Sequence, residues 1–368
     1  MRAFTRQRSV CLSSLALAGT LAAACKPDLP TEATPAELTI AGARGSSPGY
    51  TTANLGVLSG DNSSRANGVN DAGEVVGYSC CSPQTRAFVT LGGALTALAG
   101  DFGNALAISN GTTRYVVGWA GPTSLPVKWS IAGNTPSQPT NLGVGAATSG
   151  AARGVNDAGE SVGNAGSSAA MWDASGNLTL VSAPQGFTRG EGRDINNAGH
   201  AVFAFSRSDA GWPGGIAIGY LRLASGDLIP LPALAANGIS YANSLTSVTN
   251  DLVQVAGSSY ATPSSPRAVR WTVNVVSKQI VSTEVRSESS HAVGISDAGA
   301  ASGFSEGPPN SLKTTAIRWQ GSALLSLSPP KGGKEGKAWV TSPNGQFIAG
   351  EAIVQLSRRA ILWTFPSP

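Results

Sequence analysis

The sequence predicts an all-β fold, a seven-bladed β-propeller that an N-terminal strand closes into a ring. Three observations predict this fold. A two-part motif recurs seven times, equivalent positions of successive copies lie 40 to 54 residues apart, and the many Gly and Pro residues suit a chain with frequent tight turns. A repeat of about 40–50 residues is typical of propeller blades, each of which is a sheet of four strands.

The first part of the motif is a polar turn between two strand-like segments. It reads A-N-G-V-N-D-A-G-E-V-V-G at 66–77 and A-R-G-V-N-D-A-G-E-S-V-G at 152–163. Asn and Asp favour a turn because their side chains bond to nearby backbone N–H groups, and Gly supplies the positive φ. We therefore predict a hairpin between the first two strands of each blade. Its closing residues are Gly77, Gly118, Gly163, Phe203, Gly257, Gly303 and Gly350.

The acidic residues of this turn raise the alternative of a metal site. Calcium needs several oxygen ligands that converge on one ion. The turn offers only Asp71 and Glu74 in the first unit, and other units hold Ser, Asn or Pro at equivalent positions. We predict a structural turn and no metal site.

The second part of the motif is an apolar strand that ends in an aromatic residue, as in R-A-V-R-W (267–271) and R-A-I-L-W (359–363). A fourth strand follows, for example at 94–99 and 177–181. Because an aromatic residue repeated at one position usually packs between blades, we predict packing rather than sugar stacking for Trp129, Trp172, Trp271, Trp319 and Trp363. Trp212 and Trp339 lie outside the pattern, and Trp212 is the better candidate for an exposed contact.

The last unit lacks a fourth strand of its own. The segment T-A-N-L-G-V-L (52–58) resembles P-T-N-L-G-V-G (139–145), which ends the second unit. We therefore predict that the N-terminal strand completes the last blade, so that the propeller comprises residues 50–366. Closure of this kind removes exposed sheet edges.

The N-terminal residues predict an exported lipoprotein. Arginines precede an apolar run that is shorter than the ~20 residues needed to span a bilayer, so residues 1–24 are interpreted as a signal peptide. The run ends in L-A-A-A-C, which resembles a bacterial lipobox, and Cys25 is the predicted lipidation site. Residues 25–49 are predicted to be a flexible tether. Lys26, rather than Asp, follows the Cys, which by resemblance to the Gram-negative sorting rule favours the outer membrane or the cell surface.

Linked in this order, the two motifs resemble those of the HAF-repeat family of bacterial extracellular proteins, over about residues 52–364. The family repeat runs roughly A-x-G-I-N-x-x-G-x-V-V-G and then H-A-F-x-W. Arg86, Arg267 and Arg359 take the place of the family His in three units, and no unit keeps a His there. The resemblance implies a propeller-like fold and an exported location far more than an activity.

Charge and residue types exclude several classes of function. Loss of the three signal-peptide arginines reduces the net charge from +4 to +1, so the sequence pI of about 9.0 does not indicate a nucleic-acid partner. The chain has no phosphate-binding loop and no Cys/His spacing suited to zinc, so no cofactor is predicted. We also expect a monomer that reaches the membrane only through its lipid anchor.

Cys80 and Cys81 are adjacent, after a predicted strand at 75–78. A vicinal disulfide would be strained, because neighbouring Cα atoms are closer than is usual for bridged cysteines. Two free thiols in a loop are the alternative, although free thiols are unusual in an oxidising compartment.

Propellers usually bind ligands where the loops that enter the innermost strands converge around the central channel. The candidate binding residues of this rim are Arg65, Asp101, Arg153, Arg193, Tyr241, His291 and Lys337, and Arg189 and Glu191 lie in the same segments. Arg153 and Arg193 occupy equivalent positions in adjacent units, so a cationic patch is the alternative to a merely solvated rim, which the sequence favours. An anion or a glycan carboxylate is the first candidate ligand for such a patch.

No catalytic residues are predicted. His200 occupies a position in a hairpin turn, and a Ser-His-Asp arrangement would require His291. The sequence thus predicts a non-catalytic binding or scaffold module for a protein or glycan at the cell envelope. The alternative is a propeller hydrolase or lyase that acts on extracellular polysaccharide through His291, Tyr241 and the arginines. A lectin with one site per blade is disfavoured because the rim residues vary between units.

Overall fold

A computed structural model describes residues 38–39, 49–81, 84–100, 102–209, 212–235, 238–260, 262, 265–307 and 313–367. These residues form strands β1 to β30 and the turns between them, with no helix among them. Accordingly, none of the described segments is a helix able to cross a membrane. The predicted signal peptide and Cys25 lie outside the described residues.

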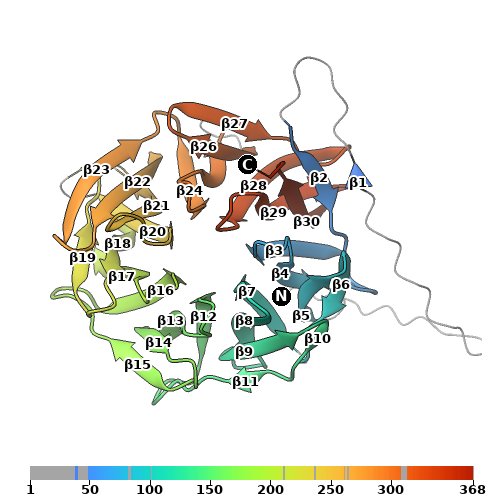
Figure 1. The fold of residues 1–368 in the computed structure, drawn as a ribbon, viewed down its shortest axis with the longest axis horizontal. Coiled ribbons are helices and arrows are strands. Elements are labelled where there is room, and N and C mark those ends of the chain that lie inside the picture. Colours follow the sequence, from blue (N-terminus) through green and yellow to red (C-terminus); the bar gives the residue numbers. More distant parts are fainter. Residues whose placement is uncertain are drawn as a thin grey trace, which may run out of the picture. The chain divides into compact units, whose positions relative to one another are not determined.

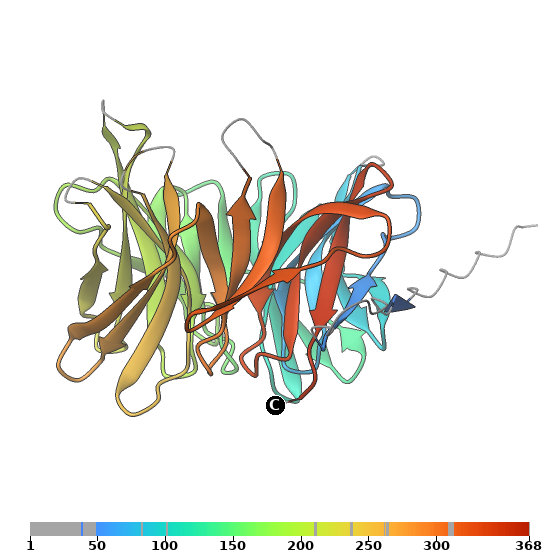
Figure 2. The same ribbon diagram turned by 90° about the horizontal axis from the view of Figure 1, so that it is seen from above.

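Seven antiparallel sheets surround a common axis, as the sequence predicts (Figure 1). Figure 2 shows the same ring from its side. We number the sheets as blades 1 to 7. Blade 1 consists of β3 (Ser63–Val69), β4 (Val75–Cys80), β5 (Thr85–Leu91) and β6 (Ala94–Ala97). Blade 2 consists of β7 (Gly103–Ile108), β8 (Thr113–Ala120), β9 (Leu125–Ala132), β10 (Thr135–Pro136) and β11 (Thr140–Asn141).

Blades 3 to 6 have four strands each. Blade 3 consists of β12 (Gly150–Val155), β13 (Ser161–Ala165), β14 (Ser168–Trp172) and β15 (Leu178–Val181), and blade 4 of β16 (Arg189–Ile195), β17 (Ala201–Asp209), β18 (Trp212–Arg222) and β19 (Leu228–Leu231). Blade 5 consists of β20 (Ile239–Leu245), β21 (Leu252–Tyr260), β22 (Pro266–Asn274) and β23 (Gln279–Val285), and blade 6 of β24 (Ser290–Ile295), β25 (Ala301–Glu306), β26 (Thr314–Gln320) and β27 (Ala323–Leu327).

Blade 7 joins the two ends of the propeller. Its strands are β28 (Gly333–Thr341), β29 (Phe347–Val354), β30 (Ser357–Thr364), β2 (Thr51–Asn54) and β1 (Leu38–Thr39). β2 pairs with β30 so that Thr52 lies opposite Trp363. The prediction that an N-terminal strand closes the ring is therefore confirmed. The short β1, from the segment predicted as a tether, pairs with β2 in turn.

A β-bulge explains the closing Gly of the repeat. In blade 3 the register shifts between Ala152 and Gly154, opposite Gly163. A Cβ atom on Gly163 would overlap the carbonyl oxygen of Ala151 and lie 2.9 Å from the Cα atom of Ala152. In blade 4 the small residue is on the other strand, because Phe203 lies opposite Gly192.

The hairpin turns bond each blade to the next. Within one turn, Asn156 Oδ1 accepts hydrogen bonds from the N–H groups of Ala158 and Glu160, as the sequence predicts for a structural turn. Between turns, the Asn110 N–H donates to Asp157 Oδ1 over 2.7 Å, and the Asp157 N–H donates to Asn197 Oδ1 over 2.9 Å. The Asp position of the motif therefore also joins neighbouring blades. Equivalent bonds link Asn344 to Asp71, Asp71 to Asn110, and Ser247 to Asp297.

The five repeated tryptophans are buried and make the blade contacts predicted for them. Each is at most 3% exposed. The Trp129 indole N–H donates to the carbonyl of Ala99 over 2.9 Å, and that of Trp172 to the carbonyl of Gly143 over 2.7 Å. The Trp363 indole N–H likewise donates to the carbonyl of Ser328, so these three side chains anchor the connection between two blades as well as filling the core.

Candidate functional site

The predicted rim residues lie within the innermost strands rather than in the loops that precede them. They occupy β3 (Arg65), β12 (Arg153), β16 (Arg193), β20 (Tyr241), β24 (His291) and β28 (Lys337). Asp101 lies outside the described residues. The innermost strands run from one end of the ring, here called the mouth, to the end that carries the hairpin turns, here called the turn end.

A central cavity of about 520 Å³ is lined by the innermost strands of all seven blades. Arg65, Arg153 and Arg193 lie in its wall, and Asp194 directly follows Arg193 in β16. Asp71, Asp157 and Asp297 line the cavity from the hairpin turns at the turn end. The turn end is therefore negatively charged, and an anionic ligand is favoured only on the mouth side of these turns.

The first charged cluster, called cluster A, joins blades 3 and 4. Arg153 Nε lies 3.3 Å from Glu191 Oε2, and Arg193 forms an ion pair with the other oxygen of the same carboxylate. The arginine side chains are 35% and 33% exposed, and their Nε atoms have no hydrogen-bond partner. Burial lowers the pKa of Arg153, an effect that Glu191 opposes. Two guanidinium groups share one carboxylate, so the cluster retains a positive charge that can bind an anion.

An open groove of about 490 Å³ continues outward from cluster A. Arg189 and Tyr241 line it together with the two arginines. Asn164, Ser167 and Ser206 also line the groove. Burial raises the pKa of Tyr241, so that its phenol is protonated at neutral pH and can donate a hydrogen bond.

The second charged cluster, called cluster B, joins blades 7 and 1, which lie on the other side of the ring from blades 3 and 4 (Figure 1). Glu351 Oε2 lies 3.8 Å from Arg65 Nε and 3.2 Å from Arg358 Nε, so two arginines again share one carboxylate. The Arg65 guanidinium carbon lies 4.0 Å from the centroid of the Trp339 ring, and Lys337 Nζ lies 5.5 Å from it. Cation–π contacts of this kind hold charged groups in place without neutralising them.

An arc of rings connects the groove to cluster B along blades 5, 6 and 7. The successive rings are those of Tyr241, Tyr260, His291, Phe304 and Trp339. Their centroids are 6.2, 5.9, 4.5 and 5.4 Å apart, in that order. Phe304 and Glu351 were not predicted from the sequence. Both directly follow a closing Gly, and this position lies opposite the rim residue of the innermost strand.

His291 makes hydrogen bonds through both ring nitrogens. Its Nε2 lies 3.1 Å from Glu306 Oε1 and its Nδ1 lies 3.1 Å from Ser258 Oγ. Burial lowers the pKa of His291, and Glu306 opposes this effect. Because a carboxylate can only accept, Nε2 of the neutral ring carries the proton and Nδ1 accepts from Ser258. His200, in contrast, is part of a hairpin, where its Nδ1 accepts from the Ala224 N–H.

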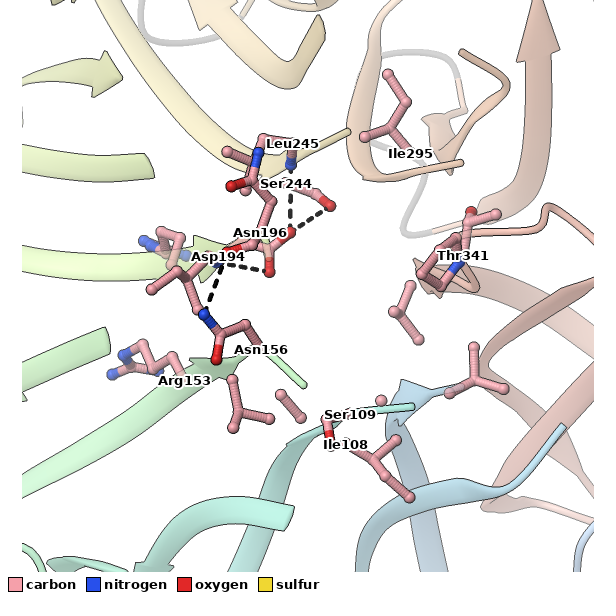
Figure 3. A pocket seen from close by; sticks show the side chains of 18 of the residues that line it. Ile108, Ser109, Arg153, Asn156, Asp194, Asn196, Ser244, Leu245, Ile295 and Thr341 are labelled. Atoms are coloured by element: carbon pink, nitrogen blue, oxygen red, sulfur yellow. Dashed lines mark hydrogen bonds between the residues drawn. The ribbon is translucent and has the colours of Figure 1, made fainter. Parts of the chain in front are cut away.

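Asp194 lies in the cavity wall (Figure 3). Of the acids there, it has the most strongly shifted pKa. Its Oδ2 accepts hydrogen bonds from Ser244 Oγ over 2.7 Å and from the Leu245 N–H over 3.2 Å, which joins blade 4 to blade 5. Burial raises its pKa to about 6, although these hydrogen bonds act in the opposite direction.

Cys80 and Cys81 are joined as a disulfide at the end of β4, with Cα atoms 3.7 Å apart. They do not line the central cavity or the groove. Among the described residues there is also no group of three or more His, Cys, Asp or Glu side chains that could hold a metal ion.

Comparison with known proteins shows similarity at the level of fold. No protein-family model matches the chain, and no curated protein sequence matches it. Virginiamycin B lyase from Staphylococcus aureus is 12% identical, with a TM-score of 0.52 over 86% of this chain and 99% of that chain. The β-propeller domain of the Trilobed protease from Pyrococcus furiosus is 9% identical, with a TM-score of 0.52 over 82% of this chain and 94% of that domain. The chain is a β-propeller. Identities this low carry no further conclusion about activity.

Proposed function

We propose that this propeller is a non-catalytic binding module for a carboxylate-bearing glycan, held at its mouth. The observation that carries the proposal is cluster A, in which Arg153 and Arg193 from adjacent blades share the single carboxylate of Glu191. A carboxylate from a ligand would balance the second guanidinium charge, for which the single carboxylate of Glu191 provides no counter-ion.

The lining of the groove favours a sugar over other small acids. Its volume of about 490 Å³ lies within the usual range for small-molecule sites. Ser167 and Ser206 carry hydroxyl groups that can exchange hydrogen bonds with sugar hydroxyls, and the Tyr241 phenol remains a donor at neutral pH.

The side chains best suited to catalysis are already engaged. Both nitrogens of His291 have partners within the protein, and the raised pKa of Tyr241 disfavours a phenolate base. One observation favours the hydrolase alternative. Glu306 is hydrogen-bonded to His291, which is hydrogen-bonded to Ser258, and such a series of acid, base and hydroxyl can activate the hydroxyl as a nucleophile. Ser258 is only 3% exposed, however, which closes its hydroxyl to a polysaccharide.

Calorimetric titration with glucuronic and galacturonic acids, and with glucose and galactose as neutral counterparts, tests the binding proposal. We expect the acids to bind and the neutral sugars to bind at least about tenfold more weakly, because each charge-assisted hydrogen bond contributes roughly 1.5–3 kcal/mol. Arg153→Gln and Arg193→Gln should each weaken binding of the acids. Lys278→Gln, which removes a cation paired with Asp227 outside the site, should not. Equal binding of acids and neutral sugars would refute the proposal.

Incubation of the protein with acidic polysaccharides tests the catalytic alternative. New reducing ends or unsaturated products released from acidic polysaccharides, and lost in Ser258→Ala and His291→Gln, would establish a hydrolase or lyase in place of a binding module. We expect the polysaccharide to remain intact.

The location of the protein is a further part of the proposal. The apolar N-terminal run and L-A-A-A-C support export and lipidation at Cys25, and the linked motifs support kinship with the HAF-repeat proteins. Intact-mass spectrometry of the mature protein from a bacterial host should find an acylated N-terminal Cys25. A mature protein that begins elsewhere without acyl groups would contradict this assignment.

A further inference from the structure

We infer that the ligand is a linear acidic glycan, with carboxylates on successive sugar residues, that lies across the mouth and contacts clusters A and B together. The inference rests on the proposed function, since it extends the same site from one carboxylate to several.

The two clusters have the same construction on facing sides of one cavity. In each, two arginines share one glutamate, which leaves one positive charge. Arg65 of cluster B and both arginines of cluster A line the same cavity of about 520 Å³. A ligand that fills this cavity therefore meets both clusters. A single uronic acid has one carboxylate and can satisfy only one of them.

The charge of the turn end decides how a polyanion is oriented. Asp71, Asp157 and Asp297 line the cavity from the hairpin turns at the turn end. A chain with many carboxylates would be repelled there. It can approach cluster B only by crossing the mouth, and it cannot thread along the axis.

The groove provides a path along which the glycan can continue beyond cluster A. Arg189 lies in this groove with Arg153 and Arg193, between blades 3 and 4. Cationic groups thus succeed one another from Arg189, through cluster A, to Arg65. A polymer with regularly repeated carboxylates matches such a series, whereas a compact multivalent anion does not.

A length series of oligogalacturonates, from one to six residues, tests this inference by calorimetry. For the wild-type protein, we expect affinity to rise at least about tenfold once the oligomer is long enough to contact both clusters, because the second contact becomes intramolecular. Arg65→Gln should remove this rise and leave the affinity for the monosaccharide within about twofold. Arg153→Gln should weaken binding at every length, and Lys278→Gln at none.

Arg65 also stacks on Trp339, so a change in folding must be separated from a change in binding. Arg65→Lys keeps the charge and should retain most of the length dependence, and circular dichroism should show the same fold for both variants. An affinity that does not depend on length, or equal weakening of all lengths by Arg65→Gln, would refute the spanning ligand and leave the single-anion site intact. Failure of every acidic sugar to bind would refute both proposals. Equal affinity for an oligoglutamate of matched charge would refute the glycan assignment.

Discussion

Replacement of Gly163 by Ala tests the explanation given for the repeat. The added Cβ would overlap the carbonyl oxygen of Ala151 and lie 2.9 Å from Ala152 Cα. These obstructing atoms belong to the backbone of a paired strand and cannot rotate away as a side chain would. Overpacking of a core usually costs about 1–3 kcal/mol, and we expect the upper end of that range, about 3 kcal/mol, because a β-bulge must shift.

Urea unfolding followed by tryptophan fluorescence measures this loss, since the repeated tryptophans are buried in the blades. Gly143→Ala is the matched control, because its added Cβ would approach nothing closer than Leu178 Cβ at 4.0 Å. The control should change the free energy of unfolding by no more than about 0.5 kcal/mol. If Gly163→Ala is as stable as the control, steric exclusion at the bulge is not the reason for the closing Gly.

Three further predictions concern the turns, the cavity wall and the cysteines. Asp157→Ala should lower stability by roughly 1.5–3 kcal/mol in urea unfolding, whereas Asp157→Asn should keep most of it, because an amide oxygen can still accept from the Asn110 N–H; equal losses would contradict the role given to this acceptor. The folded-state pKa of Asp194, about 6, is above its ordinary value of 3.8, so the protonated carboxyl stabilises the fold below about pH 4. The protein loses about 3 kcal/mol of this stability as pH rises from about 4 through 6. Urea midpoints measured between pH 4 and 7 should therefore fall with pH, and Asp194→Asn should reduce this pH dependence; an unchanged pH dependence would disprove the assignment. Non-reduced intact-mass spectrometry should find Cys80 and Cys81 resistant to alkylation until a reductant is added, and two alkylatable thiols would rule out the disulfide.

The fold could be predicted because its determinants are local and repeated. Gly163 and its counterparts mark the bulge, the tryptophans mark the ends of the third strands, and 52–58 is similar to a fourth strand of another unit. The physical reason why these residues recur was harder to infer from the sequence. Nothing in a single copy shows that the Asp of one turn caps the backbone of the preceding blade, because that contact joins residues 47 positions apart, as in Asn110 and Asp157.

The site could be predicted only in part. Arg153 and Arg193 were identifiable because they share a repeat position, and the structure places them together with Glu191. Trp339 departs from the repeat, and this departure was the only signal of its place in the cavity wall. Glu351 and Phe304 gave no such signal, because the repeat has no preferred residue after its closing Gly. Their roles depend on side chains that meet across blades.

Closure of blade 7 by β2 has a consequence for biosynthesis. β2 is made early, yet its partner β30 follows roughly 300 residues later, and closing a flexible loop of that length costs about 5 kcal/mol of chain entropy. The ring therefore cannot close before β30 has been made, and the edge of β30 stays unpaired until β2 arrives. During that interval the edge can accept the N-terminal strand of another copy, so high expression levels favour strand-exchanged dimers.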